Sequence, residues 1–280
     1  MNKIQFLISP DACFVYHMLS VAGCGYDNDH GRTYRCIYPA EDLAILKAYE
    51  SLLTVEGGAH CGALYWYLVA QPACGKVPAI EYYRDFPKSC YMEDLAGFSQ
   101  PIRQICAVMI RCYPIYLEHV WPQSSDAIRH YIEPLASRFE DGNFTELAEA
   151  HMSCVLEQPV FYAVMTDSME NGAEAIDIAP DMDVFSITRP HSQAYQFIAH
   201  EYIIYLLKVA LRDTTAFQSF ETWTITEALA EYYLQQIMGQ TGMFLPQSNW
   251  IRFYEECRRQ NPALSPLSLY LAAEKELTGK

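Results

Sequence analysis

The chain has 280 residues, of which 51% are hydrophobic and 19% are charged. That composition is typical of a globular protein with a sizeable core and excludes a disordered chain. Its 34 acidic and 19 basic residues give a formal net charge of −15, which argues against nucleic-acid binding because phosphate contacts require a basic surface.

The first residues predict an edge strand over 4–8 followed by a helix. They do not form a signal peptide, because the apolar run is short and is interrupted by Gln5, Pro10 and Asp11. No apolar run in the chain is long enough to cross a membrane. Ten cysteines are scattered without a Cys-x-x-Cys pair, which indicates reduced thiols. We therefore expect a soluble, cytoplasmic protein with no membrane partner.

Hydrophobic periodicity predicts helices through most of the first half and again near the C-terminus, with short strands between them. The expected helices cover residues 11–22, 40–54, 59–70, 78–86, 101–120, 124–139, 144–156, 192–211, 224–239, 248–259 and 265–277. Strands are expected over residues 160–166, 174–178 and 184–187. The predicted fold class is α+β, predominantly helical with a small antiparallel sheet.

A shift in composition near residues 121–125 suggests one boundary. Residues 1–120 would form a mostly helical N-terminal region, and residues 121–280 would hold the strands and the later helices. A single continuous fold remains open, because the strand over 4–8 can join the later sheet.

His200 and Glu201 stand inside the strongly apolar helix expected over 192–211. In a His-Glu-x-x-His helix, two imidazoles four residues apart share one face and bind zinc, and the Glu acts as general base. Here the fourth position after His200 is Ile204, which has no lone pair to offer a metal. Glu227 follows on the next predicted helix, in the sequence Glu-Ala-Leu-Ala-Glu that ends at Glu231.

These residues resemble the active-site core of the gluzincin (thermolysin-like) zinc metallopeptidases, over roughly the C-terminal half of the chain. The resemblance implies that His200 is the first zinc ligand, Glu201 the catalytic base and Glu227 the third ligand. Ile204 then occupies a vacated second-ligand position. It also implies a gluzincin-like C-terminal part in which a small sheet precedes the metal helix.

The missing ligand decides what function the resemblance implies, because catalytic zinc sites keep three protein ligands. The first hypothesis is a catalytically impaired or inactive homologue that binds zinc weakly or not at all and keeps a cleft for a peptide or protein segment. The alternative is an active zinc peptidase in which another residue substitutes for the lost histidine. The sequence does not indicate the oligomeric state of the protein.

Other side chains have accessory or rival roles in these hypotheses. Tyr202 and Tyr205 flank Ile204 and offer phenols, and Glu231 shares a helix face with Glu227. His191 stands about 13 Å from His200 along a straight helix, too far to share a metal. A more remote alternative is a thiol enzyme that uses Cys61, expected at a helix N-terminus beside His60.

Four further histidines show no pattern that predicts a partner. They are His17, His30, His119 and His130.

Overall fold

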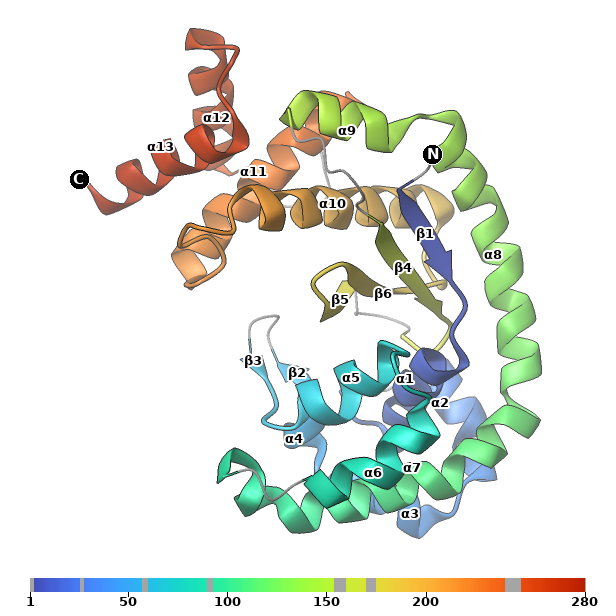
Figure 1. Cartoon of the computed structure of the whole chain (residues 1–280). Coiled ribbons are helices and arrows are strands. Elements are labelled where there is room, and N and C mark those ends of the chain that lie inside the picture. The colour runs from blue at the N-terminus through green and yellow to red at the C-terminus, as the bar shows by residue number, and fades with distance from the viewer. Residues whose placement is uncertain are drawn as a thin grey trace. The chain divides into compact units, whose positions relative to one another are not determined.

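A computed structural model describes residues 3–25, 28–56, 60–89, 93–153, 160–169, 175–239 and 248–279. The chain divides into two compact units (Figure 1), neither of which is one continuous stretch of sequence. Unit 1 comprises Met1–Gln5, Leu135–Phe161 and Ser192–Lys280, and unit 2 comprises Phe6–Pro134 and Tyr162–His191.

Helices dominate the described residues, as predicted. The α-helices are α1 (Pro10–Ala22), α2 (Asp29–Tyr34), α3 (Ala40–Ala48), α4 (Glu50–Leu53), α5 (Gln71–Ala73), α6 (Ala79–Ser89), α7 (Ser99–His119), α8 (Trp121–Asp141), α9 (Phe144–Met152), α10 (His191–Ala210), α11 (Phe220–Met238), α12 (Asn249–Gln260) and α13 (Pro266–Thr278). Shorter helical segments are η1 (Arg35–Ile37), η2 (Trp66–Ala70) and η3 (Glu93–Phe98). The strands are β1 (Ile4–Leu7), β2 (Val55–Glu56), β3 (His60–Cys61), β4 (Phe161–Thr166), β5 (Ala175–Ala179) and β6 (Met182–Ser186).

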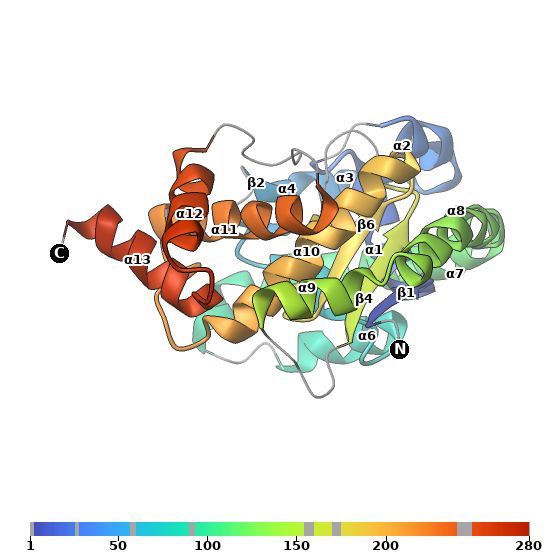
Figure 2. The same ribbon diagram turned by 90° about the horizontal axis from the view of Figure 1, so that it is seen from above.

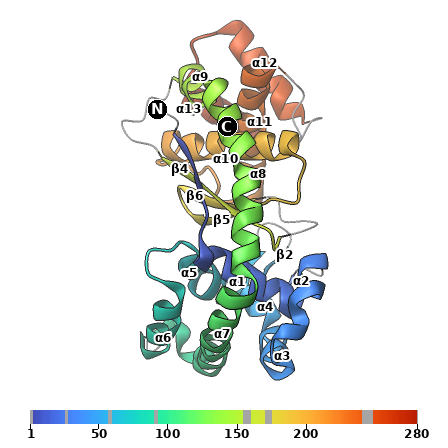
Figure 3. The ribbon, with the colours of Figure 1, turned by 90° about the vertical axis from the view of Figure 1, so that its right-hand side faces the viewer.

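The core of unit 2 is built around α1, which is buried from Ala12 to its end at Ala22. Ser9 caps its first turn by accepting a hydrogen bond from the Ala12 N–H at 3.1 Å, and Gly23 ends it in the left-handed conformation (φ 70°). Helices α2, α3, α5 and α7 pack against α1, and Figure 3 shows it among them.

The larger sheet has the strand order β1-β4-β6-β5. Strands β5 and β6 pair antiparallel as a hairpin, but β4 and β6 are parallel, so the expectation of a purely antiparallel sheet is wrong. The physical reason is that β5 runs opposite to β4 without pairing with it. Strand β6 turns back from β5 and pairs with β4. Because β5 is antiparallel to both strands, β6 runs in the same direction as β4. The N-terminal strand β1 joins this sheet beside β4, which is one of the two arrangements that the sequence left open.

Two expected helices are not formed as predicted. Of the helix expected over 59–70, residues 60–70 hold strand β3 and the η2 segment instead, because β3 pairs with β2, with Val55 opposite Cys61, and residue 59 lies outside the described residues. The helix expected over 40–54 is divided at Tyr49 into α3 and α4. Glu174 and residues 154–156, which the sequence assigned to a strand and a helix, lie outside the described residues.

In unit 1, α11 packs against α9, α12 and α13 (Figure 2). None of the helices that the structure describes is long and apolar enough to cross a membrane.

Candidate functional site

Two buried helices of unit 1 carry the residues that the metallopeptidase resemblance selects. Helix α10 buries most of its length, including His200 at 1% exposure and Ile204 at 3%. Helix α11 begins with a capping box in which Ser219 and Thr222 exchange hydrogen bonds between side chain and backbone. It ends at Gly239 in the left-handed conformation (φ 64°). Local signals therefore set the start and end of α11, and Glu227 lies two turns into it.

The structure brings His200 and Glu227 into direct contact. The Nε2–H of His200 donates to Oε2 of Glu227 at 2.9 Å, and the Glu227 side chain is 15% exposed. The two residues that the resemblance assigns as first and third metal ligands therefore meet each other across two helices.

Carboxylates surround His200 and change its acidity. Burial of the ring lowers the pKa of His200. The hydrogen bond to Glu227 and the negative charges of Glu227, Glu201 and Glu231 raise it, and the balance leaves the pKa above its usual value. The site therefore favours a positively charged imidazole beside a carboxylate.

Glu231 follows Glu227 by one turn on the same face of α11 and is fully buried. Its Oε1 accepts a hydrogen bond from the side chain of Gln235 at 3.0 Å. Glu201 is half-buried on α10. Both carboxylates contribute charge near the imidazole of His200.

The tyrosines beside Ile204 are engaged elsewhere in unit 1. The Tyr202 hydroxyl donates to Oε1 of Glu149 at 3.2 Å, and the same carboxylate receives the Lys3 ammonium, with Nζ 2.6 Å from Oε2. Tyr205 lies against the ring of Phe161, with centroids 5.9 Å apart. Tyr202 is therefore part of a Lys3–Glu149–Tyr202 group on another face of α10.

The donor set around His200 does not fit a catalytic zinc ion in this arrangement. Among the residues that the structure describes, no group of three or more His, Cys, Asp or Glu side chains is placed to hold a metal. Ile204 adds an apolar side chain four residues after His200, where a second histidine would point the same way.

The residues of the other hypotheses lie in unit 2. Cys61 stands on strand β3, so the expectation of a helix N-terminus that lowers its thiol pKa is wrong. His191 stacks on the ring of Tyr131 with centroids 4.4 Å apart, and its Nε2 lies 3.1 Å from the Tyr131 carbonyl oxygen.

The structure also shows a hydrogen-bonded group in unit 2 that sequence reasoning missed. His17 Nδ1 lies 2.7 Å from His30 Nε2, and His17 Nε2 lies 2.9 Å from the Tyr38 hydroxyl. His30 Nδ1 is 3.8 Å from Oδ2 of Asp167, which accepts a hydrogen bond from Ser124 at 2.5 Å. Burial, and secondly the neighbouring His30, lower the pKa of His17 well below its usual value. These residues come from separate segments, so no spacing in the sequence signals their contact.

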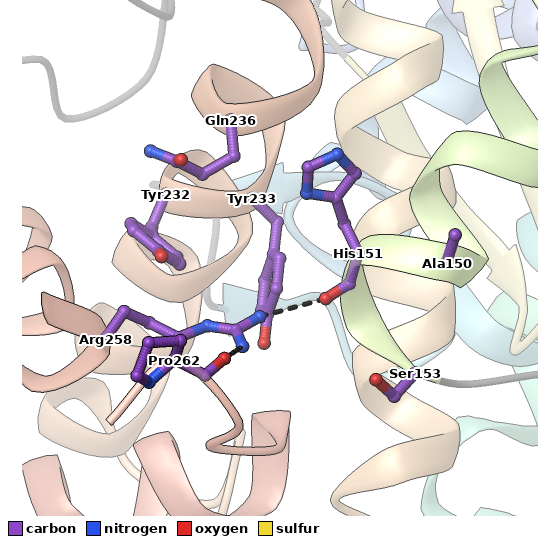
Figure 4. A pocket seen from close by; sticks show the side chains of 8 residues that line it. All are labelled: Ala150, His151, Ser153, Tyr232, Tyr233, Gln236, Arg258 and Pro262. Carbon is purple, nitrogen blue, oxygen red and sulfur yellow. Dashed lines mark hydrogen bonds between the residues drawn. The ribbon is translucent and has the colours of Figure 1, made fainter. Parts of the chain in front are cut away.

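A pocket of about 400 Å³ opens in unit 1 between the end of α9, the C-terminal part of α11 and the end of α12 (Figure 4). Its residues on α11 are Tyr232, Tyr233 and Gln236. At about 100° per residue, Tyr232 and Gln236 point about 140° and 180° away from Glu227. This pocket is therefore separate from the His200–Glu227 contact.

Comparisons with known proteins assign no family to the chain. No family model matches the chain, and neither does any curated protein or solved structure.

Proposed function

We propose that unit 1 carries a metallopeptidase-like site that has lost zinc catalysis and serves to bind a peptide or protein segment. The observation that carries this proposal is the buried contact of 2.9 Å between His200 and Glu227, with Ile204 buried one turn further along α10. In this interpretation, the two remaining ligands of an ancestral metal site bond to each other.

The charges around His200 support the proposed loss of the zinc ion. A zinc ion would supply positive charge among the carboxylates Glu201, Glu227 and Glu231, and the protonated imidazole of His200 supplies it in this arrangement. An ion pair of this kind keeps α10 and α11 together without a metal. Loss of the metal is then compatible with a retained fold and a retained binding surface.

Metal content after a change at Ile204 tests the proposal. The purified, untagged wild-type protein should hold far less than one zinc per chain after equilibration with micromolar zinc. Ile204→His should bind near-stoichiometric zinc, because a second imidazole then joins His200 and Glu227. Ile204→Cys is the second test variant, since a thiol is a zinc ligand that a buried apolar position accommodates more readily.

Matched controls separate ligation from the effect of a new polar side chain. Ile203 is also a buried isoleucine of α10 but faces another direction, so Ile203→His and Ile203→Cys should not gain zinc. Addition of Glu227→Ala to the Ile204 variants should remove the gained metal. Unchanged zinc affinity in folded Ile204→His and Ile204→Cys would show that this position is not the second-ligand position.

The zinc content of the wild-type protein also tests the alternative, an active zinc peptidase. Near-stoichiometric zinc that disappears in His200→Ala would mean that another residue replaces the lost histidine. The chain would then be a candidate zinc peptidase with Glu201 as general base, and the proposed loss of catalysis would be wrong.

A further inference from the structure

The pocket of about 400 Å³ in unit 1 has a mostly polar lining. Its volume falls within the range of small-molecule sites, about 300–1,000 Å³. Its exposed lining residues make it accessible to solvent, and they include His151, Ser153 and Gln236. Figure 4 shows the guanidinium of Arg258 beside Tyr233, with its hydrogen bonds to the backbone carbonyl oxygens of His151 and Pro262.

Arg258 is held in one orientation inside this pocket. Its Nη2 donates to the His151 carbonyl oxygen at 2.9 Å, and its Nη1 donates to the Pro262 carbonyl oxygen. The guanidinium also lies over the ring of Tyr233, 5.8 Å from the centroid. A half-buried guanidinium fixed in this way loses little further side-chain freedom when it binds a ligand.

Several acceptors at the edge of the pocket already receive hydrogen bonds. The backbone N–H of Ser153 donates to the carbonyl oxygens of Ala150 and Glu149 at the end of α9, and the guanidinium of Arg258 donates to the carbonyl oxygen of His151. Donor groups on the lining side chains include the Tyr232 phenol, the Gln236 amide and the Ser153 hydroxyl. Each of these three groups can also accept a hydrogen bond, so the guanidinium of Arg258 is the lining side chain that donates only.

We propose that this pocket binds the carboxylate of a small organic acid or of a peptide C-terminus. Among the eight lining residues that the structure describes, Arg258 is the one that carries a full charge irrespective of pH near neutrality, and its planar guanidinium matches a carboxylate. A single positive charge with neutral donors suits a monoanion better than a phosphate dianion. The exposed ring of Pro262 offers apolar contact to the body of the ligand.

The binding does not depend on the metallopeptidase-like site, because the pocket lies on another face of α11 from Glu227. The negative charge of Glu255 acts on Tyr232, but Glu255 is not part of the described lining.

Calorimetry or NMR titration with matched probes tests the proposal on the full chain. Benzoate is compared with benzamide, which has nearly the same shape and no charge. The peptide acetyl-Ala-Ala-Phe with a free C-terminus is compared with its C-terminal amide. We expect saturable binding of benzoate, of the free-acid peptide or of both, and much weaker binding of the neutral probes. Binding of one acid and not the other identifies the source of the carboxylate.

Substitutions of the lining residues show whether the carboxylate binds in this pocket. Arg258→Gln should weaken carboxylate binding by at least about tenfold, the size expected for a hydrogen bond to a charged group. Arg259→Gln is the matched control, because Arg259 is exposed and pairs with Glu256 outside the pocket, and it should leave affinity unchanged. Tyr232→Phe and Gln236→Ala should each weaken binding and provide the test if Arg258→Gln does not fold.

Two results would overturn the proposal. One is equal affinity for benzoate and benzamide and for the two peptide forms, or no saturable binding of any probe. The other is carboxylate binding that Tyr232→Phe, Gln236→Ala and Arg258→Gln all leave unchanged, or that Arg259→Gln weakens as much as Arg258→Gln does.

Discussion

The imidazole of His200 and the carboxylate of Glu227 meet at 2.9 Å, although 27 positions separate them in the sequence. His200 is buried and Glu227 nearly so, and each lies on a helix whose other buried residues are largely apolar. The contact is therefore a polar link inside an apolar helix pair, and it should contribute to the stability of unit 1.

Glu227→Gln should destabilise unit 1. The variant keeps the shape of the side chain but replaces a charge-assisted hydrogen bond by a neutral one, and we expect a loss of about 1 kcal/mol in the free energy of unfolding, the difference between the two kinds of bond. Urea unfolding at pH 6 measures it. Glu276→Gln, at an exposed position of α13, should change stability little. Equal effects of the two substitutions would contradict a stabilising role for the contact.

Tyr202→Phe should lower stability by about 1 kcal/mol, because the variant loses the hydrogen bond from its hydroxyl to the buried Glu149 carboxylate. In the Ile204→His background it should leave zinc affinity unchanged, since the Tyr202 hydroxyl contacts Glu149. Weaker zinc binding in the double variant would instead give Tyr202 the accessory role that the sequence suggested.

Gly31→Ala should destabilise unit 2 strongly. A Cβ at Gly31 would lie 2.4 Å from the Ser20 carbonyl oxygen, so α1 and α2 would have to separate. We expect a loss of about 1–3 kcal/mol, as for other overpacked sites. Gly97→Ala is the matched control, because a Cβ there meets nothing within 4 Å. Circular dichroism during urea unfolding distinguishes the two, and equal stability of both variants would contradict the close approach of α1 and α2.

His17 should make unit 2 less stable in acid. Its folded-state pKa lies well below its usual value because of burial, so the unfolded chain takes up the proton first. The stability associated with the neutral ring is present above about pH 6.5 and is lost as the pH falls below this value. His30, Tyr34, Tyr38 and Tyr116 face the ring, and none of them supplies a negative charge near neutral pH.

Urea unfolding at pH 7.5 and pH 5.5 checks this prediction. The wild-type protein should lose more stability between the two pH values than His17→Gln, which cannot be protonated. His130→Gln, at an exposed position of α8, should behave like the wild type. An identical pH dependence for the wild type and His17→Gln would show that the buried ring does not control acid stability.

Sequence alone determined most of the helices and the strands of the larger sheet, because these elements depend on local signals. Ser9 before α1 and the apolar spacing of α10 are examples, since capping and periodicity act within a few residues. The same reasoning failed over residues 59–70. There, pairing of Val55 with Cys61 gives hydrogen bonds to a neighbouring segment that a helix pattern does not anticipate.

The relationships between distant segments were decided only by tertiary structure. The parallel pairing of β4 with β6, the contact of His17 with His30 and the pocket around Arg258 each join residues without a shared sequence period. The resemblance paired His200 with Glu227, but their direct bond and the burial of Ile204 required the packing of α10 and α11. The physical reason is that helix and strand formation depend on nearby residues, whereas strand direction and side-chain contacts depend on which distant surfaces bury each other.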